Sequence, residues 1–177
     1  MYFDLGPQER SSFLDVCRHT VLEGPLSLVR FSDSGRGHQG GHGTFDSRTG
    51  LWKGYWMYAS EVGEMLDAVA TNGPYGLRVV REISERWAVC DDWGDLQRAW
   101  VMDIPAGGTL DAWFGLAKFQ PRTSTQAQRS SGKSSANSYG GGSLQLIVGL
   151  RRHQRRWIRD PIPTLGLSKK KLLERER

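Results

Sequence analysis

The segment YGGGSLQLIV, residues 139–148, contains the strand that most constrains the fold. Alternation along a strand puts Gln145 on the face opposite to Leu144, Leu146 and Val148. Three glycines and a serine precede this apolar run, so a ligand could approach the backbone closely there. A glutamine at the start of an otherwise apolar strand, directly after such a loop, predicts a polar site at this point.

The rest of the chain divides by charge. It has 177 residues, of which 38% are hydrophobic, enough for one compact domain with its own core. Residues 151–177 hold ten Lys/Arg and three Asp/Glu, a net charge of +7, so the +5 of the whole chain leaves −2 for residues 1–150. We therefore expect one catalytic domain over 1–150 and a basic, solvated tail over 151–177, so that truncation after Ile162 spares the activity. Nucleic-acid binding is disfavoured for the domain but stays open for the tail.

Cysteine content and hydropathy indicate the compartment of the protein and whether it spans a membrane. Cys17 and Cys90 are too few for a disulfide framework. The N-terminus MYFDLGPQERSSF has neither the basic region nor the apolar region of a classical signal peptide. No stretch approaches the length of a membrane span. The sequence therefore predicts a soluble protein without a classical signal peptide.

Secondary structure is predicted from the period of the apolar residues and from capping residues. Helices are expected over 11–24 and 60–73, and strands over 26–32, 51–59, 77–83, 98–105 and 144–150. The Ser- and Gly-rich segment 122–143 is expected to be a mobile surface loop. Too few helices alternate with strands for a doubly wound sheet, so the fold class is α+β with a mostly antiparallel sheet.

Arg30 is the second polar residue on an apolar strand. It lies between Val29 and Phe31 and shares a face with Leu26 and Leu28. A charge on an apolar face costs several kcal/mol unless it is paired or reaches water. Arg30 either extends to solvent from an edge strand or binds a phosphate or ribose through its planar fork. If its strand adjoined that of Gln145, the two side chains would form a small polar cleft.

Three segments together resemble the layout of ADP-ribosyltransferase-like domains. They are a strand arginine (Arg30), an aromatic and serine segment that enters a helix (GYWMYASEVGEML, with Tyr58 and Ser60), and a late strand with one polar residue (Gln145). In that family the arginine binds NAD, the middle segment supports the nicotinamide-ribose site, and a glutamate on the last strand contacts the ribose. This chain departs from the pattern because it has glutamine in the last position.

A second resemblance accommodates the glutamine. GGTLDAWFG (107–115) followed by GGGSLQ (140–145) is similar to the necrotizing-toxin type of NAD glycohydrolase, which has a Trp-Phe-Gly segment and then a Gly-Gly-Gly-Thr-Gln segment. The glutamine of that second segment is a key catalytic residue in those enzymes. Here Leu144 is inserted and the spacer between the two segments is far longer. The resemblance implies that Trp113 and Phe114 lie in the site, and that NAD+ is the substrate.

The chemistry of NAD+ cleavage assigns a role to each of these residues. Breaking the nicotinamide–ribose bond passes through an oxocarbenium-like state, as glycoside hydrolysis does. Arg30 is expected to bind the diphosphate, while Ser60 and Gln145 orient the ribose. The expected contacts to NAD+ come from Arg30, Phe31, Tyr58, Trp113, Phe114 and Tyr139. A glutamine adds no negative charge to the transition state, which favours hydrolysis over transfer to a protein.

Alternative functions stay open. The glutamine could belong to a mono-ADP-ribosyltransferase toxin. The loop GRGHQGGHG could instead supply His38 and His42 as acid and base of a ribonuclease, and the tail could dock a non-enzymatic binding module on a partner. No Cys or carboxylate lies at ligand spacing from these histidines, so no metal is expected. The resemblance further implies a domain of a larger secreted toxin that reaches the cytoplasm of a target cell and is neutralised by an immunity protein.

Overall fold

The computed structural model describes residues 3–33, 39–70, 75–89, 95–121 and 138–174. The helices of these parts are α1 (Pro7–Ser11), α2 (Gln39–His42), α3 (Ala59–Ala70), α4 (Tyr75–Trp87), the 3-10 helix η3 (Arg152–Trp157) and α6 (Lys169–Leu173). The strands are β1 (Arg18–Glu23), β2 (Leu26–Ser32), β3 (Thr44–Asp46), β4 (Leu51–Tyr58), β5 (Arg98–Ile104), β6 (Thr109–Leu116), β7 (Gln120–Pro121), β8 (Ser138–Tyr139), β9 (Leu144–Leu150) and β10 (Ile162–Pro163).

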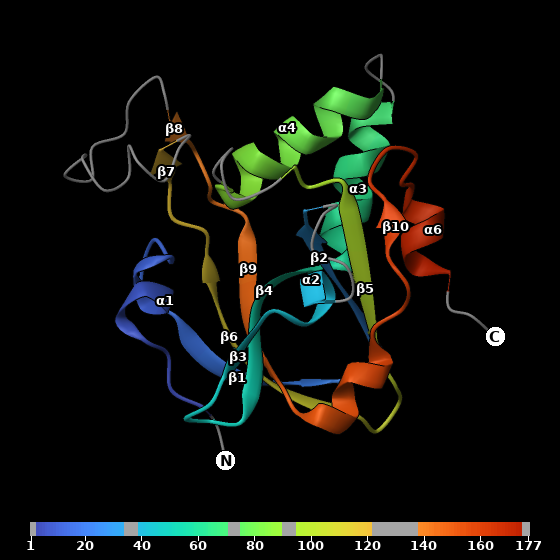
Figure 1. Cartoon of the computed structure of the whole chain (residues 1–177). Helices are drawn as coiled ribbons and strands as arrows, with labels where there is room; N and C mark the ends of the chain where they lie inside the picture. The colour runs from blue at the N-terminus through green and yellow to red at the C-terminus, as the bar shows by residue number, and fades with distance from the viewer. Residues whose placement is uncertain (1–2, 34–38, 71–74, 90–94, 122–137, 175–177) are drawn as a thin grey trace.

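One antiparallel sheet dominates the fold, so the α+β class is confirmed. Its strand order is β1-β6-β9-β4-β2-β5-β10, with β3 paired to β4, and β7 and β8 form a separate pair. Each of these pairs is antiparallel in the described parts of the chain. Figure 1 shows α3 and α4 at one end of the sheet, with α6 beside α3. The strands expected over 26–32, 51–59, 98–105 and 144–150 are confirmed as β2, β4, β5 and β9. The helix expected over 60–73 is confirmed as α3 up to Ala70, and residues 71–73 lie outside the described residues.

The two faces of the sheet bury separate apolar clusters. Alternate residues of β2 divide between them, with Val29 and Phe31 packing against α3 and α4, and Leu28 facing the opposite cluster. We call these the helix-side core and the opposite core. Trp56, fully buried, belongs to the opposite core, whereas its neighbour Met57 belongs to the helix-side core. Both sides of the central strands are therefore buried.

Two predicted elements are wrong. Residues 11–24 are not a helix, because β1 pairs along its whole length with β6. Residues 77–83 are not a strand but part of α4, whose buried Val79, Ile83 and Trp87 recur every four residues. In a window as short as seven residues, helical and strand periods fit the same apolar positions, and tertiary pairing decides between them.

A buried lysine fixes the N-terminal segment to the sheet. The Lys53 side chain is 8% exposed, and its Nζ lies 3.0 Å from both Asp46 Oδ2 and the Asp4 carbonyl oxygen. This hydrogen bond from Lys53 is the main reason that the pKa of Asp46 falls to about 2. The segment held here includes Ser12, which borders the cavity described below.

The basic C-terminal segment is part of the core, and the expectation of a solvated tail is wrong. β10 extends the sheet beside β5, and Leu167 and Leu172 are fully buried in the helix-side core. Lys169 Nζ also forms an ion pair with Asp67 of α3 at 3.0 Å. Charge alone suggested solvation, but the apolar residues between the charges pack against α3. Truncation after Ile162 would expose this core and is now expected to destabilise the protein.

Replacement of Leu167 by alanine tests this packing. Leu167→Ala removes a fully buried side chain and should lower the free energy of unfolding by about 2–4 kcal/mol. The matched control is Leu165→Ala two residues away, since Leu165 is 76% exposed and its loss should cost less than about 0.5 kcal/mol. Urea denaturation of the three proteins measures both values. Equal stabilities of the two variants would show that the segment does not pack as described.

Candidate active site

The sheet opens where β2 meets β4. β4 pairs with β9 over Trp52–Trp56, and β2 pairs with β5 along its full length. Between β2 and β4, by contrast, only Leu28↔Tyr58 and Val29↔Met57 are paired. The two strands therefore separate beyond this point, where the residues after Val29 on β2 and those before Met57 on β4 border the gap.

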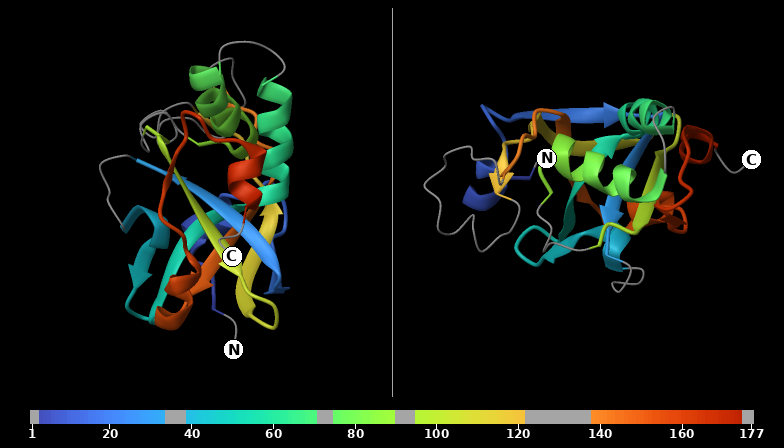
Figure 2. Two further views of the ribbon diagram at one scale, coloured as in Figure 1. Left: turned by 90° about the vertical axis from the view of Figure 1, so that its right-hand side faces the viewer. Right: turned by 90° about the horizontal axis from the view of Figure 1, so that it is seen from above.

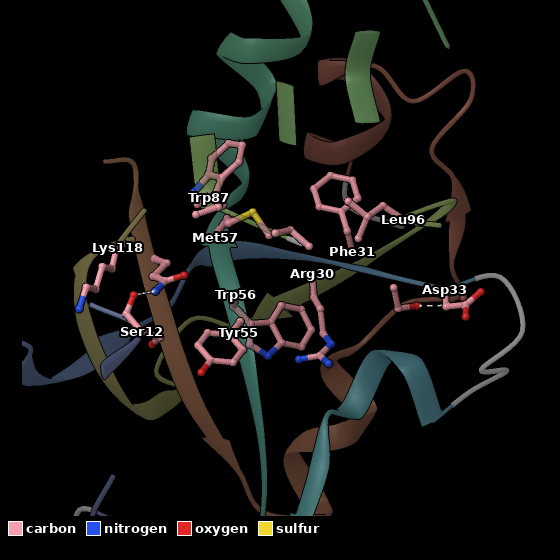
Figure 3. A pocket seen from close by; sticks show the side chains of 14 residues that line it. Ser12, Arg30, Phe31, Asp33, Tyr55, Trp56, Met57, Trp87, Leu96 and Lys118 are labelled. Atoms are coloured by element: carbon pink, nitrogen blue, oxygen red, sulfur yellow. Dashed lines mark hydrogen bonds between the residues drawn. The ribbon is translucent and has the colours of Figure 1, made fainter. Parts of the chain in front are cut away.

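A cavity of about 340 Å³ lies at this gap, between the strands and the C-terminal end of α4. Its volume lies in the range of roughly 300–1,000 Å³ that is typical of small-molecule sites. Its walls combine aromatic rings with a few polar groups (Figure 3). It is lined by Arg30, Phe31, Ser32 and Asp33 of the β2 segment, Tyr55, Trp56 and Met57 of β4, Trp87, Ala88 and Val89 after α4, and Ser12, Leu96, Lys118 and Gln145.

Gln145 lines this cavity as a buried side chain with one fixed end. It is 6% exposed, and its Nε2 donates a hydrogen bond of 3.0 Å to the carbonyl oxygen of Ser12. In the described parts of the chain no donor contacts Oε1, so this oxygen is the end that can accept a hydrogen bond from a ligand. The same bond to Ser12 also fastens the N-terminal segment to β9, so Gln145 has a structural role as well.

Arg30 borders the cavity from the other face of the sheet. Its guanidinium lies against Gly54 of β4, because a Cβ atom added to Gly54 would be 2.1 Å from Arg30 Nη1. The strands of Arg30 and Gln145 are not neighbours, since β4 lies between β2 and β9. The expectation of a cleft between two adjacent strands is thus wrong. Both residues nevertheless line one cavity, because β4 separates from β2 there and side chains from both faces of the sheet reach the gap.

Tyr55 and Trp56 are cavity residues that the sequence analysis missed. Burial raises the pKa of the Tyr55 phenol, while a hydrogen bond with the Ser12 side chain acts in the opposite direction. The phenol is therefore a neutral hydrogen-bonding group at physiological pH. Trp56 Nε1 is buried and has no hydrogen-bond partner in the described parts of the chain, which is costly for a donor. Figure 3 shows the Trp56 ring between Tyr55 and Arg30.

The remaining predicted residues are placed as follows. Phe31 lines the cavity, together with Trp87 of α4, another residue that was not predicted. Ser60 is exposed at the start of α3, and it is absent from the cavity wall. Tyr58, Trp113 and Phe114 are also absent from it. Trp113 donates a 2.7 Å hydrogen bond to the carbonyl oxygen of Phe3, and Tyr58 and Phe114 pack against the opposite core. Tyr139 belongs to β8, but its side chain lies outside the described part of the structure.

Aromatic composition alone could not show which aromatic residues line the cavity and which pack elsewhere. Tyr55 and Trp56 belong to the run LWKGYWMYA, in which every second residue points to the same face. Which of its aromatic residues meets the cavity depends on where β2 leaves β4, and no local pattern encodes that position. Trp87 was missed because its helix was predicted as a strand.

The glycine-rich loop before β9 holds α4, and the amides of Gly141, Gly142 and Ser143 are already hydrogen-bonded. Gly141 N donates to the Glu85 carbonyl oxygen at 2.8 Å, and Ser143 N donates to that of Arg86 at 3.1 Å. These are carbonyls of the last helical turn, which otherwise lack partners. Gly141 has φ +67°, and a Cβ atom there would be 2.4 Å from the Ala117 carbonyl oxygen. The loop thus sets the position of the cavity wall formed by the end of α4.

Backbone strain also gathers at this wall. Among the described residues, the non-glycine residues with positive φ are Ala88 and Leu96, both at 51°. Each lines the cavity. Ala88 directly follows α4, where the Val89 amide donates to the Ser84 carbonyl oxygen, an arrangement in which glycine is usual. Strained backbone of this kind is frequent at functional sites.

The histidines proposed for a ribonuclease are placed apart from the cavity or not described. His38 lies outside the described residues. His42 Nδ1 lies 3.0 Å from Arg155 Nη2, and its ring meets Trp52 edge-on, but it does not line the cavity. Within the described ranges no group of three or more His, Cys, Asp or Glu side chains could hold a metal ion.

Comparison with known proteins gives no independent assignment. The chain matches no protein-family model, no curated protein and no solved structure. Among the described helices, none is long and apolar enough to cross a membrane. The arrangement of the cavity residues therefore carries the functional argument.

Alanine substitutions in the glycine loop test its capping role. Gly141→Ala should lower the free energy of unfolding by about 2–5 kcal/mol, because the left-handed conformation costs about 1–2 kcal/mol and overpacking about 1–3. Gly140→Ala is the matched control, since nothing lies within 4 Å of its added Cβ and its φ is not in the left-handed range. Thermal denaturation compares the two. A Gly141→Ala protein as stable as Gly140→Ala would contradict the described loop.

Proposed function

We propose that the chain is an NAD+ glycohydrolase that cleaves the nicotinamide–ribose bond. The observation that carries this proposal is that one cavity gathers Arg30, Phe31 and Gln145. These three residues come from two segments more than one hundred positions apart, and the sequence alone predicts a contact with NAD+ for each of them. The aromatic lining and the cavity volume are compatible with part of a dinucleotide.

The reaction needs positioning more than acid catalysis. When the bond between the ribose C1′ and the nicotinamide nitrogen breaks, its electron pair goes to the ring, and the cationic leaving group becomes neutral. Positive charge then develops on the ribose, and water adds to C1′ and loses a proton to solvent. The site must therefore hold the nicotinamide ring, orient the ribose hydroxyls and admit water.

The cavity residues divide these tasks. Phe31, Met57 and Trp87 provide an apolar wall for the nicotinamide ring. Gln145 Oε1 accepts a hydrogen bond from a ribose hydroxyl, while its Nε2 stays on Ser12 and fixes the orientation of the amide. Arg30 provides a cation for the diphosphate. The Tyr55 hydroxyl and Trp56 Nε1 add hydrogen-bonding groups beside Arg30 that the sequence reading did not include.

Hydrolysis is favoured over transfer to a protein because Gln145 is neutral. A carboxylate at this position could stabilise positive charge on the ribose or activate an acceptor side chain, and an amide does neither as well. A mono-ADP-ribosyltransferase is the second candidate, and Gln145 is the residue that separates the two. Delivery as part of a larger toxin, and neutralisation by an immunity protein, are parts of this proposal that rest on the resemblance alone.

Gln145→Ala, compared with Gln154→Ala, separates catalysis from structure. Gln154 is 7% exposed, and its Nε2 donates a 2.9 Å hydrogen bond to the Thr109 carbonyl oxygen, so it matches Gln145 away from the cavity. Each change should cost about 1–3 kcal/mol of stability, because it leaves a carbonyl without its donor, and Gln154→Ala also leaves the Arg151 amide without its acceptor. Only Gln145→Ala should lower kcat for NAD+ cleavage, by about 10²-fold or more. The assay follows NAD+ loss and the release of nicotinamide and ADP-ribose by mass spectrometry.

The outcomes are distinct. Intact NAD+ after long incubation with concentrated wild-type protein would refute the glycohydrolase. Equal turnover by both variants per folded molecule would show that Gln145 only supports the fold. Gln145→Glu adds a further comparison at nearly equal volume. Loss of hydrolysis with gain of self-modification would favour the transferase candidate, whereas loss of both activities would favour the glycohydrolase.

Gly54→Ala tests Arg30 without changing it. The added methyl would occupy the position of the Arg30 guanidinium, so that group must move. If Arg30 binds the diphosphate, KM for NAD+ should rise roughly tenfold or more with a smaller change in kcat, as expected for a lost charge-assisted contact. If Gly54→Ala folds poorly, Arg30→Lys replaces it as the test. This variant should also raise KM, because lysine lacks the planar fork. Gly140→Ala serves as control, and unchanged KM in both variants would remove Arg30 from the site.

A further inference from the structure

A second polar feature lies at the far end of β9, away from the cavity. Five arginines follow this strand within nine residues, namely Arg151, Arg152, Arg155, Arg156 and Arg159. Arg159 is neutralised by Asp103, with Nε 2.8 Å from Oδ2. In the described parts of the chain no carboxylate pairs with the other four. Arg151, Arg152 and Arg156 are exposed, so they form a positive patch on the surface.

The arginines are held on a rigid support. Between them lies Gln154, which is buried and accepts a 2.8 Å hydrogen bond from the Arg151 amide while it donates to Thr109 of β6. Trp157 packs against the opposite core, and Ile158 bridges to Met102 of β5. The backbone of η3 is thus fixed on two strands, and the arginine side chains project from a defined position.

Aromatic side chains adjoin this patch. Trp52 of β4 pairs with Leu150, so it lies where the chain enters η3. The Arg155 guanidinium lies 4.7 Å from the Trp52 ring centroid, and the Phe45 ring lies 5.0 Å from the Trp52 ring on the other strand of the hairpin. Phe45 is 50% exposed. Figure 2 (left) shows η3 beside the β3–β4 hairpin that carries both rings.

We propose that Arg151, Arg152, Arg156 and Phe45 form a surface that binds single-stranded nucleic acid. Arginines neutralise phosphates, and the exposed Phe45 ring, connected to the arginine segment through Trp52 and Arg155, provides a face on which a base stacks. An acidic protein would also neutralise the arginines, but it would leave a half-exposed phenylalanine without a specific partner. The surface is separate from the cavity, and binding there does not depend on the proposed reaction with NAD+.

Charge-matched variants locate the binding. Fluorescence anisotropy with a labelled 12-nucleotide deoxythymidine strand measures affinity over a range of salt concentrations. Arg152→Gln with Arg156→Gln should weaken binding about tenfold or more and reduce the salt slope by about 1.4, since each phosphate contact on a single strand contributes about 0.7. The control is Arg81→Gln with Lys170→Gln, exposed residues of α4 and α6 that remove the same charge elsewhere. Equal loss in both double variants would overturn the proposal.

An aromatic variant separates nucleic acid from a general polyanion. Phe45→Ala should weaken binding about fivefold or more at unchanged salt slope, because stacking is lost and no charge is removed. Leu165→Ala, which removes another exposed apolar side chain, should have no effect. Polyglutamate should compete poorly, because it has charge but no bases. Unchanged affinity of Phe45→Ala together with effective competition by polyglutamate would show an acidic-protein surface and overturn the proposal.

Discussion

Because β2 and β4 are joined by only two residue pairs, the sheet opens between them, and the other features of the site follow from this opening. Two residue pairs keep the sheet continuous, and the separation that follows creates its cavity. Phe31 and Met57 are buried in the helix-side core and still line the cavity, because the two strands separate beside them. Gly54 makes part of this arrangement possible, because only the absence of a Cβ leaves room for the Arg30 guanidinium. Packing on both faces then stabilises a sheet that is open in the middle.

Three chain segments from outside the central strands hold the cavity walls in place. The glycine loop before β9 bonds the last carbonyls of α4, so the wall around Trp87 is fixed to the sheet. The N-terminal segment is anchored by Lys53 and by Gln145, which places Ser12 at the rim. The C-terminal segment packs Leu167 and Leu172 under α3. The cavity is therefore a product of the whole chain, and local changes far from it can alter its shape.

The two proposed sites differ in their physical basis. The cavity is mostly apolar and orients a small substrate through a few buried polar groups, of which Gln145 has both a structural and a proposed catalytic contact. The η3 surface is exposed and relies on charge and one aromatic ring, so its interactions weaken with salt. The positive charge of this surface matches the charge distribution along the chain, because the excess of Lys and Arg lies in the C-terminal segment that includes η3.

The α+β class and five of the main elements could be predicted from the sequence, and alternation along a strand singled out Arg30 and Gln145 as polar residues on apolar strands. The sequence did not determine that β4 lies between the strands of Arg30 and Gln145, that Tyr55, Trp56 and Trp87 share their cavity, or that Trp113 and Phe114 pack elsewhere. Strand order, register and the point of separation arise from contacts between residues distant in sequence. The same contacts turned a basic terminal segment, whose composition indicates solvation, into part of the core, because Leu167 and Leu172 are buried against α3 while the charged side chains described in this segment stay exposed or partly exposed.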